Sequence, residues 1–149
     1  MEFKIIETGT PEYEKMVDLR MRVLKEPFGI PFTESEREED AEAILLGAFY
    51  LNEGDIVGCC FLSHINRQRV KLRQMAVETY YQRRGLGREL IVYAERIASL
   101  RGYQEVYLHA RRTAIGFYEK QGYKAVSDIF TEVGIPHVEM VKQLTQSSV

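Results

Sequence analysis

Apolar residues recur along the chain with two spacings, and the changes between them predict the order of secondary-structure elements. Short runs rich in β-branched and aromatic residues predict strands, whereas apolar positions three and four residues apart predict helices. The predicted order is strand, helix, three strands, helix, strand, helix and two strands. The predicted strands cover 3–6, 43–51, 56–65, 70–77, 105–110, 123–129 and 138–144, and the predicted helices cover 11–24, 86–100 and 112–121.

Local signals support the boundaries of these elements. Thr10 followed by Pro11 is typical of a helix start, and Gly102 is typical of a helix end. The polar stretch 52–55 lies between two apolar runs and predicts a hairpin, so the three consecutive strands are expected to be antiparallel. The acidic stretch 34–42 predicts a solvated loop or short helix without chemistry. Together the elements predict one mixed α/β domain over 1–144, followed by a frayed polar tail over 145–149.

Length and composition fit a single globular domain. The chain has 149 residues, of which 45% are hydrophobic, and a formal net charge of −2. That charge gives no general reason to bind a polyanion, so we expect no nucleic-acid partner. The longest mainly apolar run, 43–51, is about half of the ~20 residues that a membrane-spanning helix needs, and the first residues show no secretory signal pattern. We therefore expect a cytoplasmic protein that does not engage a membrane.

The two cysteines do not suggest a disulfide framework. Cys59 and Cys60 are sequence neighbours on a predicted strand and would point to opposite faces of it. Their spacing also excludes a Cys-x-x-Cys metal motif. We expect two reduced side chains, at least one of them in the core.

The segment that joins the strand at 70–77 to the helix at 86–100 favours phosphate binding. A strand, a turn with glycines and a helix start together place unpaired backbone N–H groups and a positive helix end at one point. The segment contains neither Gly-x-Gly-x-x-Gly nor a Gly-Lys-Ser/Thr sequence, which excludes two known phosphate loops. On glycine spacing alone, a plain helix start is an equally good interpretation. The candidate phosphate-binding residues are Gln82, Arg83, Arg84, Gly85, Leu86, Gly87 and Arg88.

A second motif changes that balance. One strand further along, residues 114–123 read Ala-Ile-Gly-Phe-Tyr-Glu-Lys-Gln-Gly-Tyr. Together with the Gln-x-x-Gly-x-Gly sequence at 82–87, this segment resembles the GCN5-related N-acetyltransferase (GNAT) superfamily over nearly the whole chain. The resemblance implies a mostly antiparallel mixed sheet, splayed between its fourth and fifth strands and flanked by helices.

The resemblance also implies where acetyl-CoA would bind. The pantetheine arm would lie in the gap between 70–77 and 105–110, hydrogen bonded to the backbone of Met75, Ala76 and Val77. The pyrophosphate would lie on the amides of 82–87. Simple strand alternation places Arg73, Met75 and Val77 on one face of their strand, where they would line a common cleft.

The acid and base of the transfer reaction are also expected from the resemblance. Tyr118 matches the tyrosine that protonates the departing thiolate, for which a phenol within hydrogen-bond reach is suited. The sequence around Gly134-Ile135-Pro136-His137 resembles the glyphosate N-acetyltransferase and ElaA-like branch, which implies His137 as the base. Glu78 is the second candidate for the base. Without the motifs, Tyr118 and His137 would be interpreted as packed or hydrogen-bonded structural residues.

The same narrower resemblance implies substrate-binding residues. Arg73 and Arg111 match arginines that hold the acidic groups of the substrate, and Lys25 falls where a further arginine is expected. Because lysine lacks the planar fork of arginine, glyphosate itself is in doubt. A direct transfer of acetyl from acetyl-CoA to a small acidic amine needs no metal. His64, His109 and His137 lack the short spacing that would favour a metal site.

Several alternatives remain open from the sequence. The acceptor could be a protein lysine or N-terminus, and the chain could be a regulatory module that binds acetyl-CoA without turnover. A third alternative is an adenine-nucleotide binder that uses the same phosphate loop. A homodimer is compatible with the sequence, which shows no self-complementary patch.

Overall fold

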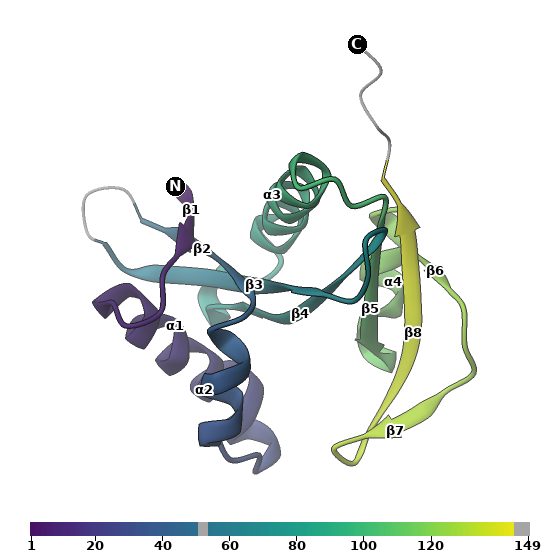
Figure 1. The fold of residues 1–149 in the computed structure, drawn as a ribbon. Helices are drawn as coiled ribbons and strands as arrows, with labels where there is room; N and C mark the ends of the chain where they lie inside the picture. The colour runs from purple at the N-terminus through teal and green to yellow at the C-terminus, as the bar shows by residue number, and fades with distance from the viewer. Residues whose placement is uncertain (51–53, 145–149) are drawn as a thin grey trace.

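A computed structural model describes residues 1–50 and 54–144. Within them, eight strands form one mixed sheet in the order β1-β2-β3-β4-β5-β8-β6, and β7 pairs with β8 (Figure 1). The proposed tail at 145–149 and the end of the second predicted strand, at Leu51, lie outside the described residues. The strands are β1 (Glu2–Ile6), β2 (Ile44–Phe49), β3 (Ile56–His64), β4 (Arg69–Val77), β5 (Glu105–Arg111), β6 (Lys124–Ala125), β7 (Phe130–Glu132) and β8 (Ile135–Gln143).

Helices cover both faces of this sheet. One face carries α1 (Pro11–Arg20) and α2 (Glu34–Asp40), and the other carries α3 (Leu86–Leu100) and α4 (Ile115–Lys120). The Thr10 hydroxyl accepts a hydrogen bond from the Tyr13 amide at 3.2 Å, which confirms the predicted helix start. The chain continues from α1 as a π-helix, Met21–Lys25, and a 3-10 turn, Glu26–Phe28. No described helix is long and apolar enough to cross a membrane.

Each face of the sheet has its own core. Leu90, Ile91 and Ala94 of α3 pack against the strands on one face. Met16 and Leu19 of α1 pack on the opposite face. Cys59 and Cys60 are both buried, one in each core, as the alternation of a strand requires. Both thiols are free, which confirms the prediction of two reduced side chains with at least one of them in the core.

The sheet opens between β4 and β5, as the resemblance implied. These parallel strands pair only from Arg69 to Lys71 on β4 and from Glu105 to Tyr107 on β5. Beyond Lys71 the edge of β4 that faces β5 has no strand partner among the described residues. The Gln74 carbonyl accepts from Cys59 Sγ and the Val77 carbonyl accepts from the Gln82 side chain, whereas the other backbone groups along this edge are available to a ligand.

A bulge in β4 corrects one expectation from the sequence. Cys59 pairs with Ala76 and Phe61 pairs with Arg73, so that Gln74 and Met75 together oppose one residue of β3. Gln74 has φ 56°, in the left-handed region. The inserted residue reverses the alternation: Met75 and Val77 pack toward the core under α3, whereas Arg73 shares the face of Phe61. The prediction that Arg73, Met75 and Val77 share one face is wrong.

The C-terminal part differs from the predicted strands. The strand predicted at 123–129 is reduced to β6, and a separate short strand, β7, forms a hairpin with β8. The helix predicted at 112–121 begins with a 3-10 turn, Arg112–Ala114, before α4. Glu132 and Ile135 pair across the hairpin turn, whose two central residues, Val133 and Gly134, have φ 47° and 76°. Two positive φ angles are typical of a type I′ turn.

Candidate active site

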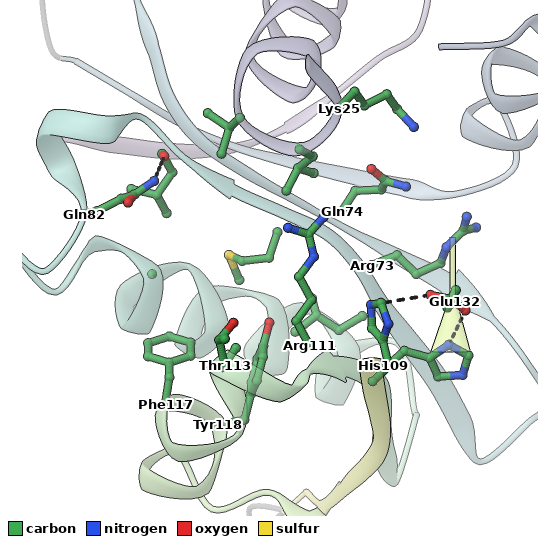
Figure 2. A pocket seen from close by; sticks show the side chains of 18 of the residues that line it. Lys25, Arg73, Gln74, Gln82, His109, Arg111, Thr113, Phe117, Tyr118 and Glu132 are labelled. Carbon is green, nitrogen blue, oxygen red and sulfur yellow. Dashed lines mark hydrogen bonds and ion pairs between the residues drawn. The ribbon is translucent and has the colours of Figure 1, made fainter. Parts of the chain in front are cut away.

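A cavity of about 760 Å³ lies where β4 and β5 diverge (Figure 2). The bulged half of β4, the end of β5, the start of α3, α4 and the β7–β8 hairpin all contribute to its wall. Gln82 and Phe117 lie toward one end in Figure 2, and His109 and Glu132 toward the other. Arg111 and Tyr118 lie between these ends. The cleft therefore brings together most of the residues that the sequence predicted for the site.

The loop before α3 offers backbone donors to an anion. Gly85 precedes the helix with φ 85°, and no side chain of the described residues caps the first amides of this 15-residue helix. Those N–H groups and the positive end of the helix dipole face the loop. Arg83, which has φ 66°, and Arg88 line the cavity with exposed side chains. This arrangement suits a phosphate or pyrophosphate group.

Gln82 and Gly87 stabilise and shape the loop, whether or not they also contact a ligand. The Gln82 side chain donates to the Val77 carbonyl at 3.0 Å, and the Gln82 amide donates to the Thr79 carbonyl at 3.3 Å. Gln82 therefore closes the loop onto the end of β4. A Cβ on Gly87 would lie 3.3 Å from the Phe117 ring and 3.9 Å from Val77, so glycine keeps this part of the cleft open.

Three residues predicted near the coenzyme do not point side chains into the cavity. Leu86 lies in the core under α3, and Ala76 lies in the core under α1. Arg84 is exposed and is absent from the cavity wall. For Ala76 and Leu86, any contact with a ligand in the cleft would be made by backbone atoms. Met75 and Val77 do line the cavity.

Tyr118 is buried at the floor of the cleft. Its ring packs edge-on against Phe117 and Tyr123, with centroids 5.1 and 5.7 Å away. Burial raises the pKa of the Tyr118 phenol well above its usual range, so the hydroxyl keeps its proton at neutral pH. That hydroxyl makes no hydrogen bond within the described part of the chain, although it lines the cavity with the rest of the side chain. It is free to donate to a ligand.

His137 lies on β8, directly opposite Arg111 on β5, and is buried. Its Nδ1 lies 2.7 Å from the carbonyl oxygen of Ile135. Because a carbonyl can only accept, Nδ1 carries the proton, and in the neutral ring Nε2 is left as the acceptor. Nε2 lies 3.8 Å from Oε1 of Glu132. The imidazole is thus oriented as a base requires.

The three cationic candidates differ in how their charges are matched. The Lys25 ammonium lies 2.8 Å from Glu36, and Arg73 lies 3.4 Å from Glu39. Arg111 has no carboxylate partner and no side-chain hydrogen bond among the described residues, and burial lowers its pKa. All three line the cavity. Arg111 is therefore the cation with the most to gain from an anionic ligand.

The alternatives weighed from the sequence have other partners. Glu78 accepts two hydrogen bonds from Arg22, at 2.7 and 3.0 Å, which makes it an ion-pair member. His64 Nδ1 lies 2.7 Å from the Tyr103 hydroxyl, and His64 does not line the cavity that His109 and His137 line. Over 1–50 and 54–144, no group of three His, Cys, Asp or Glu residues is placed to hold a metal ion.

Sequence reasoning did not single out Glu132, and it considered His109 only as a metal ligand. Glu132 and His109 both line the cavity, and Glu132 Oε2 lies 2.8 Å from His109 Nδ1 (Figure 2). The alternation of β5 held a signal for His109, because it shares a face with Arg111. No such signal existed for Glu132, because the short strand β7 was not predicted.

Comparison with protein families gives one match to most of the chain. A model described as an acetyltransferase (GNAT) domain matches residues 25–144. A Bacillus subtilis protein named as an acetyltransferase is 41% identical over 73 residues, which cover 49% of this chain and 50% of that protein. YitI of the same organism, named as an uncharacterized N-acetyltransferase, is 27% identical over 150 residues and covers 96% and 99%. The matched segment spans about half the length of the first curated relatives.

Solved structures share the whole fold. An N-acetyltransferase structure from Lactobacillus plantarum is 25% identical, with a TM-score of 0.83 and coverage of 97% of this chain and 100% of that one. An aminoglycoside 6′-N-acetyltransferase complexed with coenzyme A is 19% identical, with a TM-score of 0.79 and complete coverage of both chains. Escherichia coli ElaA is 16% identical, with a TM-score of 0.83 and coverage of 95% and 99%. The likeness to the last two concerns the fold alone.

Proposed function

The chain belongs to the GNAT acetyltransferase family, and from this premise we propose that it transfers the acetyl group of acetyl-CoA to the amine of a small molecule that carries a carboxylate or phosphonate group. The observation that carries the acidic part of the proposal is Arg111, whose guanidinium lies half-buried in the cleft without an anionic partner among the described residues. A buried cation of this kind favours a ligand with a bidentate anion.

The residues around the cleft suit acetyl-CoA at one end. The first amides of α3, together with Arg83 and Arg88, would hold the pyrophosphate. The free edge of β4 from Met75 to Val77 would pair with the amide groups of the pantetheine arm. Support comes from the solved aminoglycoside acetyltransferase of the same fold, whose structure contains coenzyme A. When bound, acetyl-CoA supplies an activated thioester.

The chain's own residues then suit direct transfer. His137 Nε2 accepts a proton from the acceptor ammonium, which frees the nitrogen lone pair. The nitrogen forms a bond to the acetyl carbon as the carbon–sulfur bond breaks. Tyr118 donates its phenolic proton to the departing sulfur, and burial keeps that proton in place until then. As the amide forms, the nitrogen loses its second proton, which restores the Tyr118 phenol. The products are the neutral amide, free coenzyme A and protonated His137.

The acid-binding role falls on Arg111, with Arg73 beside the same cleft. Lys25 also faces the cleft, but its charge is balanced by Glu36, so it contributes less to an anionic substrate. We therefore propose that Arg111 and Arg73 have the acid-binding role that the resemblance to the glyphosate N-acetyltransferase and ElaA-like branch implies, and that Lys25 does not. This leaves glyphosate itself a weak candidate, because the third cation is both a lysine and already paired.

A thiol-release screen tests the proposal. Acetyl-CoA is incubated with amino acids, aminophosphonates, amino sugars, polyamines and peptides, and free coenzyme A is measured. We expect turnover to concentrate on acidic amines. Turnover on peptides alone would establish a protein acetyltransferase instead. Tight coenzyme A binding without turnover of any amine would establish a regulatory module, and effective competition by ATP would favour a nucleotide binder.

A further inference from the structure

Glu132 presents one free carboxylate oxygen to the cleft beside the proposed base. Its Oε2 is engaged by His109 Nδ1 at 2.8 Å, whereas Oε1 accepts no hydrogen bond among the described residues. Oε1 lies 3.8 Å from His137 Nε2, which is too far for a direct hydrogen bond. The side chain of Glu132 is 43% exposed, so water or a ligand can reach this oxygen.

The surrounding hydrogen bonds fix the direction in which Glu132 points. The Tyr107 hydroxyl donates to Glu139 at 2.5 Å, and burial together with Glu139 raises the pKa of Tyr107 to about 12. Because its single proton is used there, the Tyr107 oxygen accepts from His109 Nε2 at 2.8 Å. His109 thus links Tyr107 to Glu132, with its Nδ1 2.8 Å from Glu132 Oε2. This contact holds the Glu132 carboxylate in place.

The gap between Glu132 and His137 matches one ammonium nitrogen. Two acceptors 3.8 Å apart can both lie within hydrogen-bond distance of a nitrogen placed between them. One acceptor is anionic and the other is the proposed base. Arg111 occupies the strand position opposite His137, and both residues line the same cavity as Glu132.

We propose that Glu132 is the residue that binds the acceptor as an ammonium ion, between its Oε1 and Nε2 of His137, and that His109 is a positioning residue that aims it. The inference rests on the proposed function and adds a charge requirement to it. The acceptor enters as a short zwitterion, with the cation at Glu132 and the anion at Arg111. One proton passes from the ammonium to His137, after which the neutral nitrogen reacts.

Other charged groups face this position and set the design of the test. Lys71 and Arg73 lie on β4, and Lys71 has its pKa lowered by burial and by the nearby Arg73. A general change in local charge must therefore be separated from loss of the ammonium contact. Asp128→Asn removes one charge from an exposed residue two positions before β7 that does not line the cavity, which makes it the matched control for Glu132→Gln.

The experiment uses the full chain saturated with coenzyme A or acetyl-CoA. The probes with a charged amine, called the charged probes, are glycine, β-alanine and 4-aminobutyrate. The probe with an uncharged amine, called the uncharged probe, is aminooxyacetate, which also has a carboxylate but whose amine is largely neutral at pH 7. Binding is measured by calorimetry with coenzyme A present, and turnover by thiol release. We expect Glu132→Gln to lower kcat/KM for the best charged probe about tenfold or more, mainly because KM rises.

The same variant should change the values for aminooxyacetate less than about threefold, and Asp128→Asn should change the values for neither class of probe by more than that. His109→Leu should reproduce the loss, and His109→Asn, whose amide can replace the Nδ1 donor, should recover most of it. Equal losses for charged and uncharged probes, or equal effects of Glu132→Gln and Asp128→Asn, would overturn the proposal.

Two further outcomes separate this inference from the proposed function. The wild-type chain could fail to bind any charged probe and still acetylate other amines. That result would overturn only the inference that the acceptor is a zwitterion whose ammonium group binds between Glu132 and His137. Failure to bind coenzyme A at all would overturn the proposed function. The ammonium site would then be tested by calorimetry of the charged probes on the wild type and on Glu132→Gln without coenzyme A, where equal affinities would overturn it. Unchanged coenzyme A affinity in all variants is the check that each has folded.

Discussion

The guanidinium carbon of Arg111 lies 4.2 Å from the centre of the Phe28 ring. Arg111 ends β5, whereas Phe28 belongs to the 3-10 turn that follows α1 and its π-helical extension. The contact therefore joins the end of β5 to the segment after α1, of which Val23, Leu24 and Lys25 also line the cavity. A stacked arginine keeps its planar fork directed while its N–H groups remain available.

Arg111→Ala should lower kcat/KM about 30-fold or more for an acidic amine such as β-alanine. Truncation of one partner of a desolvated charged pair costs on the order of 2–5 kcal/mol. The loss should be much smaller for the amide of the same compound, which has no anion to bind. Steady-state kinetics on the two acceptors measure the difference.

Arg111→Lys is the matched variant for that prediction. It retains the charge but loses both the bidentate fork and the stacking on Phe28, so we expect only partial recovery. An equal loss for the acid and its amide would instead assign Arg111 to packing or to coenzyme binding.

Tyr118→Phe should lower kcat at least tenfold with little change in coenzyme A affinity, because proton donation to the departing sulfur matters in the transition state. The protein should remain folded, since the lost hydroxyl makes no hydrogen bond in the described part of the chain. Tyr123→Phe is the control: that hydroxyl donates to Glu95 at 2.9 Å and should affect stability rather than kcat. A Tyr118→Phe rate within about threefold of wild type, roughly 0.7 kcal/mol, argues against the acid role.

Gly87→Glu should abolish acetyl-CoA binding in calorimetry. Even a Cβ at this position would lie 3.3 Å from Phe117, and the added carboxylate would oppose the pyrophosphate at the helix start. Val92→Glu places the same charge on the exposed side of α3 and should leave the affinity unchanged. Retention of affinity by Gly87→Glu would remove the coenzyme from this loop.

The free energy of unfolding should fall as pH rises above about 8.5. Burial raises the pKa of Cys59 to about 12 and that of Cys60 well above its ordinary value. In the unfolded chain both thiols lose their protons near pH 8.5, so the folded state then binds more protons than the unfolded state and stability decreases with pH. Each thiol contributes up to ~1.4 kcal/mol per pH unit across that window.

Urea unfolding at several pH values measures this slope. The double variant Cys59→Ala/Cys60→Ala should be less stable at pH 7 but show a shallower decline between about pH 9 and 10, before tyrosines contribute. An unchanged slope in the double variant would show that other groups cause the decline.

Val133→Asn should raise the free energy of unfolding by about 1 kcal/mol. Val133 has φ 47°, which a β-branched residue adopts at a cost and asparagine tolerates. Val126→Asn makes the same chemical change at another exposed site that lacks a positive φ, and should bring no gain. Chemical denaturation compares the two variants, and equal effects would exclude turn strain as the cause.

Most of the fold could be predicted from the sequence because its signals are local. The spacing of apolar residues and the flanking glycines locate α3 at 86–100, and the alternating apolar runs locate β3 and β5. The bulge at Gln74 carries no such signal, because glutamine is not a residue that usually marks a positive φ. Arg73 was therefore assigned to the wrong face.

The candidate site could be predicted in part. Motif positions bring Tyr118, Arg111 and His137 into one cleft as expected. Pairing between distant segments could not be predicted, because it depends on how helices and hairpins come together. Lys25 with Glu36, and Glu132 with His109, are contacts of this kind. The acidic stretch at 34–42 likewise supplies Asp40, whose carboxylate is buried against Arg20 at 2.8 Å.

The bulge at Gln74 makes the length of β4 as important as its composition. On one side of it, Arg69 to Lys71 join the two halves of the sheet, and on the other, Met75 to Val77 border the coenzyme end of the cleft. Loss of a single residue there would shift one of these segments by one position, so that each of its side chains would move to the opposite face of the sheet. A point substitution in β4 changes one side chain of the cleft, whereas one deletion would replace the side chains that face the cleft with those of the opposite face of the strand.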